Sequence, residues 1–202
     1  MSIAIIDYRA GNLTSVQRAL AQLGVAAAVT HDIDVVRASR RVIFPGVGAA
    51  ASCMANLREL GMDVALREAI AAGKPVLGIC VGMQLLFEHS EEDGGTDCLG
   101  ILPGRVRRFD LSDPGLKVPH MGWNPVAFAA DEPLAARVEP GAAFYFVHSY
   151  YCEPDAPAMT IARCDHGVRF CAGVRRDNLV AFQFHPEKSG PVGLGLLRDF
   201  CS

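Results

Sequence analysis

The stretch Lys74 to Glu88, KPVLGICVGMQLLFE, decides the fold of this chain. Val76 to Ile79 is a short apolar run that predicts a strand buried on both faces. Three apolar residues then recur at helical spacing and predict a helix: Met83, Leu86 and Phe87. Cys80 lies at the junction, where the chain has to turn from the strand into the helix.

The pattern Gly78-x-Cys80-x-Gly82 is the thiol counterpart of a nucleophile elbow. Glycines on both sides leave room for a sharp turn between strand and helix. A thiol at this turn faces the positive end of the helix, which favours the thiolate, and the N–H of Val81 can stabilise an oxyanion. On this element alone, a small buried cysteine without a chemical role explains the pattern about equally well.

The 202 residues fit one α/β domain spanning 1–202, because half of them are apolar and can form a sizeable core. The formal charge is −3 and no basic run occurs, so neither nucleic acid nor an anionic membrane surface is an expected partner. Small molecules and other proteins remain as the expected classes of binding partner. The sequence has no recognisable signal peptide or membrane-spanning run, and we expect a cytoplasmic protein.

The chain has seven cysteines without a CxxC pair: Cys53, Cys80, Cys98, Cys152, Cys164, Cys171 and Cys201. An odd number without paired spacing favours free thiols in a reducing compartment over a disulfide framework or a zinc site. We expect no metal and no cofactor.

Short apolar runs alternate with helical patterns in the first half of the chain. Ile3 to Asp7, Ala26 to Thr30 and Val42 to Phe44 predict buried strands. One apolar helical stripe lies between the first two: Leu13, Val16, Leu20 and Leu23. This alternation predicts an α/β fold with a flavodoxin-like, doubly wound and mainly parallel sheet, whose sites lie beyond the carboxyl ends of the strands.

From Leu102 onward, strands joined by turns predict an antiparallel portion at one side of the sheet. The expected strands are 106–109, 126–128, 144–151, 159–164, 168–174 and 179–184, and a helix over 195–200 closes the chain.

His185 directly follows the last expected strand and begins His185-Pro186-Glu187. Glu187 can accept a hydrogen bond from the imidazole and stabilise the imidazolium, so a Cys80–His185–Glu187 triad is predicted. Without Cys80, an exposed turn would be the preferred interpretation of His185-Pro186-Glu187. The other five histidines are expected in core, supporting or surface positions: His31, His89, His120, His148 and His166.

Two loops suggest further parts of a site. Phe44-Pro45-Gly46-Val47-Gly48 follows the third strand, and its glycines can direct peptide N–H groups at an oxyanion or simply form a tight turn. Val118 to Asn124, VPHMGWN, contains the only tryptophan and fits a partner surface or a buried structural loop about equally well.

Taken together, GICVGMQLL, FQFHPEKS and FPGVG resemble the class I (triad) glutamine amidotransferases. Within that family, IIDYRAGNLTSV, KVPHMGWN, YFVHSYY and the HPEKSG ending are similar to the glutaminase subunits of imidazole glycerol phosphate synthases. The resemblance covers essentially the whole chain in order. It strongly favours a catalytic Cys80 over a buried structural cysteine.

The resemblance implies a role for each matching residue. Cys80 would be the nucleophile, His185 the general base and acid, and Glu187 its orienter. The oxyanion hole would comprise Val81 and, after rearrangement of a peptide, the loop residues Gly46, Val47 and Gly48. Glutamine would be held by Gln84 and by the backbone near Ser149 and Tyr150.

In this family the ammonia passes to a (β/α)8-barrel cyclase subunit of histidine biosynthesis, so the resemblance implies glutamine as substrate and a heterodimer with such a cyclase. The candidate contacts with the cyclase are Pro119, His120, Met121, Trp123, Asn124 and Lys188. Three positions depart from the pattern of the family: Arg9, Val81 and Ala181. Arg9 replaces a common glycine and could alter how its loop meets a neighbour.

Two alternatives stay open. Glutaminases of anthranilate or aminodeoxychorismate synthesis share GxCxG and HPE, but PGVG and VPHMGWN argue against them. A regulatory or stress protein of the same fold could carry the triad without glutaminase activity, and it would form no thioester at Cys80 with a glutamine analogue.

Overall fold

Five short apolar segments form the parallel part of the main sheet. They are β1 (Ile3–Ile6), β2 (Ala27–Thr30), β3 (Arg41–Gly46), β4 (Val76–Cys80) and β14 (Leu179–Phe182). They pair in the order β2-β1-β3-β4-β14. In this computed structural model, which describes residues 2–11, 13–113 and 115–202, β1, β4 and β14 are buried along their whole length, as their apolar runs predict.

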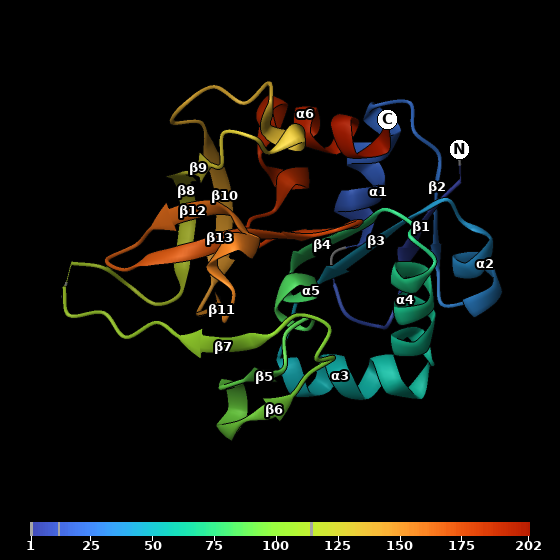
Figure 1. The fold of residues 1–202 in the computed structure, drawn as a ribbon, viewed down its shortest axis with the longest axis horizontal. Coiled ribbons are helices and arrows are strands. Elements are labelled where there is room, and N and C mark those ends of the chain that lie inside the picture. Colours follow the sequence, from blue (N-terminus) through green and yellow to red (C-terminus); the bar gives the residue numbers. More distant parts are fainter. Residues whose placement is uncertain (1, 12, 114) are drawn as a thin grey trace.

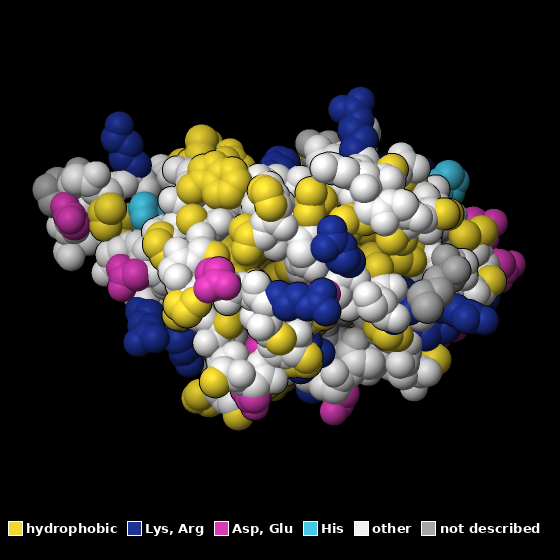
Figure 2. Space-filling view, turned by 90° about the horizontal axis from the view of Figure 1, so that it is seen from above, with side chains coloured by type: hydrophobic (Ala, Val, Ile, Leu, Met, Phe, Trp, Pro, Cys, Tyr) yellow, Lys and Arg dark blue, Asp and Glu magenta, His cyan; other side chains and the backbone are white. Residues whose placement is uncertain are grey.

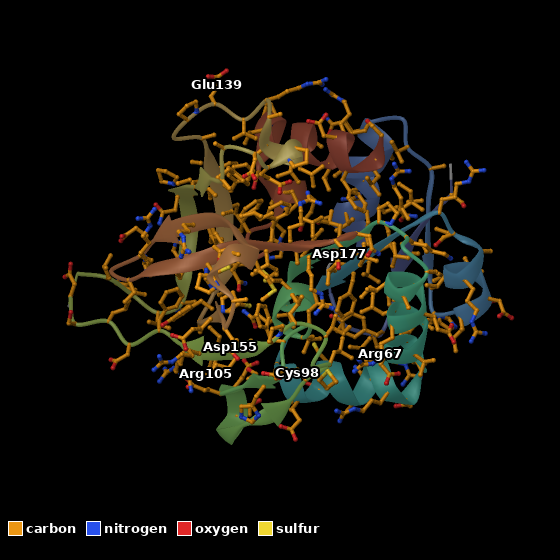
Figure 3. All side chains as sticks on the ribbon, in the orientation of Figure 1. Arg67, Cys98, Arg105, Glu139, Asp155 and Asp177 are labelled. Carbon is orange, nitrogen blue, oxygen red and sulfur yellow. The ribbon has the colours of Figure 1, made fainter. Side chains whose placement is uncertain are left out.

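Helices cover both faces of this parallel part. They are α1 (Leu13–Gln22), α2 (Ile33–Ala38), α3 (Ala50–Glu59), α4 (Met62–Ala71) and α6 (Gly190–Cys201). Figure 1 shows α1 and α6 on one side of the sheet and α3 and α4 on the other, and side chains fill the space between the layers (Figure 3). The doubly wound arrangement positions the carboxyl ends of β3, β4 and β14 at one edge.

Further strands extend the sheet beyond β14. In sheet order they are β13 (Arg169–Arg176), β11 (Tyr150–Pro154), β7 (Gly104–Arg108), β5 (His89–Ser90) and β6 (Thr96–Asp97). All pair antiparallel except β5, which is parallel to β7. The strand β12 (Thr160–Asp165) pairs with β13, and β9 (Ala127–Phe128) pairs with the other edge of β12. The described residues also include four short 3-10 helices: η1 (Glu92–Gly94), η2 (Pro133–Ala135), η3 (Pro157–Met159) and η4 (Pro186–Lys188). The predicted sheet, mainly parallel with an antiparallel C-terminal portion, is confirmed.

A separate two-stranded sheet is made by β8 (His120–Pro125) and β10 (Ala143–His148), paired antiparallel. The sequence predicted a loop over VPHMGWN and one strand over 144–151, and both predictions were wrong. Most of VPHMGWN is strand β8, and the chain breaks at Ser149 because β10 pairs with β8 whereas β11 pairs with β7 and β13. This break brings residues 148–150 close to the carboxyl ends of the central strands.

The helix after Cys80 is much shorter than its apolar spacing predicts. α5 spans only Val81–Gln84. The following carbonyl groups do not accept bonds from a continuing helix, since those of Leu85, Leu86 and Phe87 accept from the segment 99–102 at 2.7–2.9 Å. The prediction of a helix that includes Leu86 and Phe87 was therefore wrong, and the dipole of the short α5 contributes little to the site.

Other element boundaries differ by a few residues. β3 continues through Gly46, so the expected loop of residues 44–48 begins only at Val47, and α6 begins at Gly190 rather than at residue 195. Both shifts extend regular structure up to the edge where the candidate site lies.

The face shown in Figure 2 has no dominant charge. On this face, Lys and Arg side chains are interspersed with Asp and Glu side chains. Among the described residues, no helix is long and apolar enough to cross a membrane. All seven cysteines lie in the described part, and all are free and buried.

Packing of α5 against β3 requires glycine at position 82. A Cβ on Gly82 would lie 2.0 Å from the carbonyl oxygen of Phe44, far inside van der Waals contact with a backbone atom that cannot rotate away. Gly78 is similarly enclosed, since its Cβ would lie 2.8 Å from the Cβ of Ala181. The small Ala181 is therefore a packing partner of the strand that carries Cys80.

We predict opposite effects for alanine at two helical glycines. Gly82→Ala should lower the free energy of unfolding by at least about 2 kcal/mol, because the Phe44 carbonyl and α5 must separate. Gly195→Ala in α6 has open space around the new Cβ and should raise that free energy by about 0.5–1 kcal/mol. Urea unfolding of both variants measures this, and equal effects would contradict the packing argument.

Candidate active site

Cys80 lies at the turn between β4 and α5 in a conformation that L-residues rarely adopt. Its φ is 56° and its ψ is −115°, which costs about 1–3 kcal/mol. The turn is held by strand pairing before it and by the enclosed glycines Gly78 and Gly82 on either side. The thiol is thereby presented at the carboxyl edge of the sheet, as the elbow pattern predicts.

His185 and Glu187 come from the neighbouring strand end. β14 pairs in parallel with β4, so residues after Phe182 emerge at the same edge as Cys80. His185 Nδ1 lies 2.8 Å from Glu187 Oε1, and both side chains are almost fully buried. The backbone of His185 is anchored as well, because its N–H donates to the Tyr145 carbonyl of β10 at 2.9 Å and its carbonyl accepts from Ser189 Oγ at 2.6 Å.

The electrostatics of His185 favour the imidazolium. Burial lowers the pKa of His185, but the electrostatic and hydrogen-bond interactions with Cys80 and Glu187 outweigh it and raise that pKa to about 10. His185 Nε2 is buried and has no hydrogen-bond partner among the described residues, so it is available to a proton-transfer partner beside Cys80. The structure brings the three predicted triad residues together.

The predicted oxyanion segments flank the thiol. Val81 is the first residue of α5, and Gly46 is paired with Cys80 across β3 and β4. Val47 and Gly48 are exposed, and the Val47 carbonyl is held by Cys53 Sγ at 3.7 Å. Gly48 has a φ of +112°, a conformation suited to glycine, so a rearrangement of this short segment is not blocked by a side chain.

A residue that sequence reasoning missed lies behind this segment. Tyr8 is fully buried, and a Cβ on Gly46 would lie 2.2 Å from its hydroxyl oxygen. The Tyr8 side chain therefore occupies the space beneath the loop that follows Gly46. Tyr8 lies in the stretch IIDYRAGNLTSV, which carries the family resemblance but assigns Tyr8 no role, so only the three-dimensional contact reveals it.

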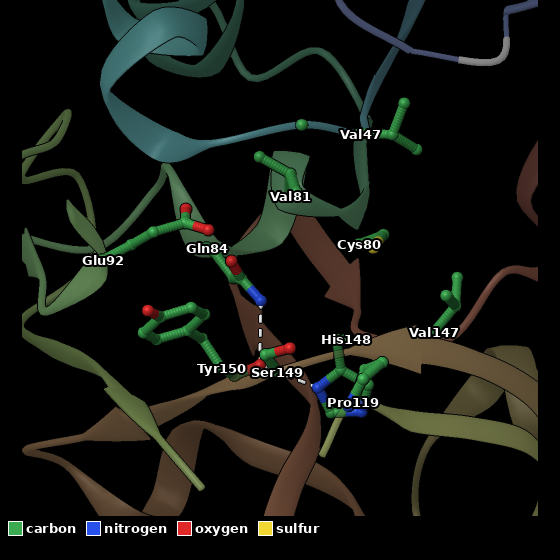
Figure 4. Close-up of a pocket in the computed structure, with 11 residues that line it drawn as sticks. Val47, Cys80, Val81, Gln84, Glu92, Pro119, Val147, His148, Ser149 and Tyr150 are labelled. Carbon is green, nitrogen blue, oxygen red and sulfur yellow. Dashed lines mark hydrogen bonds between the residues drawn. The ribbon is translucent and has the colours of Figure 1, made fainter.

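A pocket of about 400 Å³ opens at the thiol (Figure 4). Val47 and Val81 line one side of it, and residues 148–150 with Pro119 line the other. Gln84 lies at its inner end, where Nε2 donates to the Tyr150 carbonyl and to Gln183 Oε1, both at 3.0 Å. All three predicted glutamine-binding positions line this pocket: Gln84, Ser149 and Tyr150.

Glu92 also lines the pocket and was missed from the sequence. Its Oε2 accepts from the Ala50 N–H at 2.7 Å, and burial raises the pKa of this carboxyl group above its usual value. No motif marks Glu92, because it belongs to an irregular polar segment. The only signal in the sequence was an acidic residue soon after the elbow.

Arg9, which replaces the glycine common in the family, adopts a left-handed φ of 60°. That conformation explains why glycine suits the position. The Arg9 side chain pairs with Glu59 of α3 at 2.8 Å, and both side chains are more than half exposed. Arg9 thus contacts a helix of its own chain and lies outside the pocket at Cys80.

The predicted partner residues fall into two groups. Met121 and Trp123 point outward from β8 and are 63% and 57% exposed, and the ammonium of Lys188 lies 5.8 Å from the centre of the Tyr145 ring. His120 is buried between strands and is not available to a partner, so its prediction as a contact residue was wrong. Strand alternation explains the difference, since His120 and Met121 point to opposite faces. Pro119 is exposed at the pocket, and Asn124 is half-buried.

Comparison with known proteins agrees with this site. The family model "Glutamine amidotransferase class-I" matches residues 4–202. The imidazole glycerol phosphate synthase subunit HisH of Pseudomonas putida is 50% identical over 204 residues, covering 98% of this chain and 96% of that protein. The HisH subunit of Herpetosiphon aurantiacus is 52% identical over 198 residues, covering 98% and 92%.

The chain belongs to the class-I glutamine amidotransferases and, among them, to the HisH family. The resemblance noted in the sequence is thus confirmed. Solved amidotransferase structures share the fold at low identity. A crystal structure of a glutamine amidotransferase matches with a TM-score of 0.75 at 18% identity, covering 98% of this chain and 99% of that one. The glutaminase domain of Trypanosoma brucei CTPS, solved with bound acivicin, has a TM-score of 0.69 at 16% identity and covers 100% and 94%.

The amidotransferase site generates a prediction about proton affinity. Glu187→Gln removes a charge that stabilises the imidazolium, so the pKa of His185 should fall from about 10 toward its ordinary range, and the imidazolium should be lost at lower pH. Titration of the His185 ring signals by NMR measures this. The matched control is Glu139→Gln, since Glu139 is an exposed carboxylate far from the site (Figure 3). Identical His185 titration curves in Glu187→Gln and Glu139→Gln would contradict the electrostatic coupling between Glu187 and His185.

Proposed function

We propose that this HisH-family chain is the glutaminase subunit of an imidazole glycerol phosphate synthase and hydrolyses glutamine through Cys80, His185 and Glu187. One observation supports this most: a cysteine in a strained elbow conformation faces a pocket beside a buried His–Glu pair that follows the adjacent parallel strand. The ammonia would pass to a (β/α)8-barrel cyclase subunit of histidine biosynthesis.

In the first half of the reaction, Cys80 Sγ attacks the side-chain amide carbon of glutamine and forms a carbon–sulfur bond. The oxyanion that develops accepts hydrogen bonds from the Val81 N–H and from an N–H of the loop at residues 46–48, after that loop has rearranged. The imidazolium of His185 gives its Nε2 proton to the amide nitrogen, the carbon–nitrogen bond breaks, and ammonia leaves. The products are a γ-glutamyl thioester and a neutral His185.

In the second half, His185 Nε2 takes a proton from water as the oxygen attacks the thioester carbon. The carbon–sulfur bond then breaks, glutamate leaves, and the thiolate and imidazolium are restored. Glu187 stays ionised throughout. Its 2.8 Å hydrogen bond holds the His185 ring with Nε2 toward the reacting atoms.

Charged groups of glutamine match the pocket. The Glu92 carboxylate offers an acceptor for the α-ammonium group, and the Ser149–Tyr150 segment offers backbone and hydroxyl groups for the rest of the α-amino acid. Gln84 holds the side-chain end close to Cys80. These contacts fix the substrate with its amide carbon at the thiol.

The surface formed by Met121, Trp123 and Lys188 is the proposed contact for the cyclase. Two large apolar side chains with high exposure on neighbouring positions of one strand face are typical of a protein interface. This surface adjoins the catalytic residues, because Tyr145 contacts Trp123 edge-on at 6.2 Å and its carbonyl binds the His185 N–H. A partner seated here can receive ammonia without its release to bulk water.

The function is tested by glutamine hydrolysis in three mixtures: the chain alone, the chain with the cyclase, and both with the cyclase's nucleotide substrate. We expect a large nucleotide-dependent rise that is absent in Cys80→Ala. Activity that needs Cys80 but not the cyclase would assign the glutaminase to another pathway. No activity in any mixture would favour a non-glutaminase role.

Glu92→Gln should raise the KM for glutamine roughly 10- to 100-fold with a smaller effect on kcat, because a charged hydrogen bond to the α-ammonium group is lost. The neighbouring Glu91→Gln is the matched control, since Glu91 is exposed and binds the Arg108 N–H outside the pocket. Steady-state kinetics of the complex measure both. Equal KM values for the two variants would remove Glu92 from the substrate site.

A further inference from the structure

A line of hydrogen bonds runs from the outer strand β8 to the pocket. In order, it joins Asn124 Nδ2 to His120 Nε2 at 3.2 Å, His120 Nδ1 to His148 Nε2 at 3.0 Å, and His148 Nδ1 to the Tyr150 carbonyl at 2.7 Å. The Asn124 amide is also fixed at its outer end, because Nδ2 donates to the Asp165 carbonyl at 2.7 Å. The two histidines face each other in register across β8 and β10.

The direction of each bond follows from the chemistry of the groups. A carbonyl oxygen only accepts, so His148 Nδ1 carries a proton. In a neutral ring His148 Nε2 must then accept, which requires that His120 Nδ1 donates. His120 Nε2 is left as an acceptor for the Asn124 amide. One set of tautomers therefore satisfies every polar atom of both rings.

Both rings lie where a second proton is disfavoured. Burial lowers the pKa of His120 to about 4 and that of His148 to about 3. Aromatic rings surround them, with Phe146 stacked on His120 at 4.7 Å and Phe109 and Phe170 each 5.2 Å from His148. Both rings are thus stable in the neutral form, and they take no part in the proton transfers at Cys80.

The line continues to the nucleophile. The Tyr150 carbonyl accepts from His148 Nδ1 and from Gln84 Nε2, which uses both of its lone pairs. Gln84 Nε2 also donates to Gln183 Oε1 at 3.0 Å, and Gln183 Nε2 lies 3.8 Å from Cys80 Sγ. Figure 4 shows the two bonds that meet at the Tyr150 carbonyl, one from His148 and one from Gln84.

We propose that His148, held by His120, is a positioning residue for glutamine, because it fixes the Tyr150 carbonyl and through it the orientation of the Gln84 amide beside Cys80. Without the His148 donor, the Tyr150 carbonyl loses one of its two hydrogen bonds, so it and the Gln84 amide are held less firmly and the pocket is less preorganised. The inference rests on the proposed glutaminase function. It goes further by assigning a role to two buried histidines outside the triad.

The test compares His148→Leu with His148→Asn in the complex with saturating cyclase and nucleotide. Asparagine places an amide N–H near the position of Nδ1 and can still donate to the Tyr150 carbonyl, whereas leucine cannot. His166→Leu is the matched control, because His166 stacks on His120 at 4.2 Å but bonds the Lys117 carbonyl, outside the line. The readouts are kcat, KM for glutamine, and the glutamine Kd measured calorimetrically in a Cys80→Ala background.

We expect His148→Leu to raise both KM and Kd about tenfold or more with less than a threefold change in kcat. In His148→Asn, the increases in log KM and log Kd should be at most half of those in His148→Leu. His166→Leu should leave kcat, KM and Kd within twofold of the unmodified values. Unchanged KM and Kd in His148→Leu, or an equal rise in the His166→Leu control, would overturn the inference. If His148→Leu does not fold, His120→Leu against His120→Asn repeats the comparison one bond further away.

The experiment distinguishes failure of the proposed glutaminase function from failure of the positioning role of His148. An unmodified complex that hydrolyses no glutamine overturns the glutaminase function, and the positioning role with it. An active unmodified complex in which His148→Leu binds glutamine normally overturns the positioning role alone.

Discussion

The structure depends on the close approach of α5 to β3. Gly82 lies against the Phe44 carbonyl with no space for a side chain, and this contact forces the chain to turn at Cys80 into a conformation that costs about 1–3 kcal/mol. Strand pairing on both sides of β4 stabilises the turn. Because parallel strands end at the same edge of the sheet, the thiol of Cys80 and the His185–Glu187 pair lie close together there without the help of another structural element.

Around this centre, the two-stranded sheet of β8 and β10 connects the interior with the surface. Its inner face holds the histidine line, and its backbone holds His185 through the Tyr145 carbonyl. Its outer face carries Met121 and Trp123. The same two strands thus support His185, the proposed substrate pocket and the proposed contact with the cyclase.

Much of this could be predicted from the sequence, and the exceptions have a common physical cause. Cys80 ends one short buried strand and His185 follows another, so local patterns place them at one sheet edge. The length of α5 could not be predicted, because the carbonyl groups that follow it, at residues 85–87, accept hydrogen bonds from residues 99–102. Glu92 reaches the pocket through an irregular segment, and the break at Ser149 depends on which strand each neighbouring segment pairs with. Local periodicity carries no information about such non-local bonds.

The most direct test of the account is labelling with an electrophilic glutamine analogue, followed by peptide mass spectrometry across all seven cysteines. All seven are buried, so selective reaction requires the pocket and the activated thiol rather than mere exposure. The account predicts one stoichiometric adduct, on Cys80, protected by glutamine and strongly slowed in His185→Asn. An adduct on another cysteine, or equal labelling without His185, would contradict it.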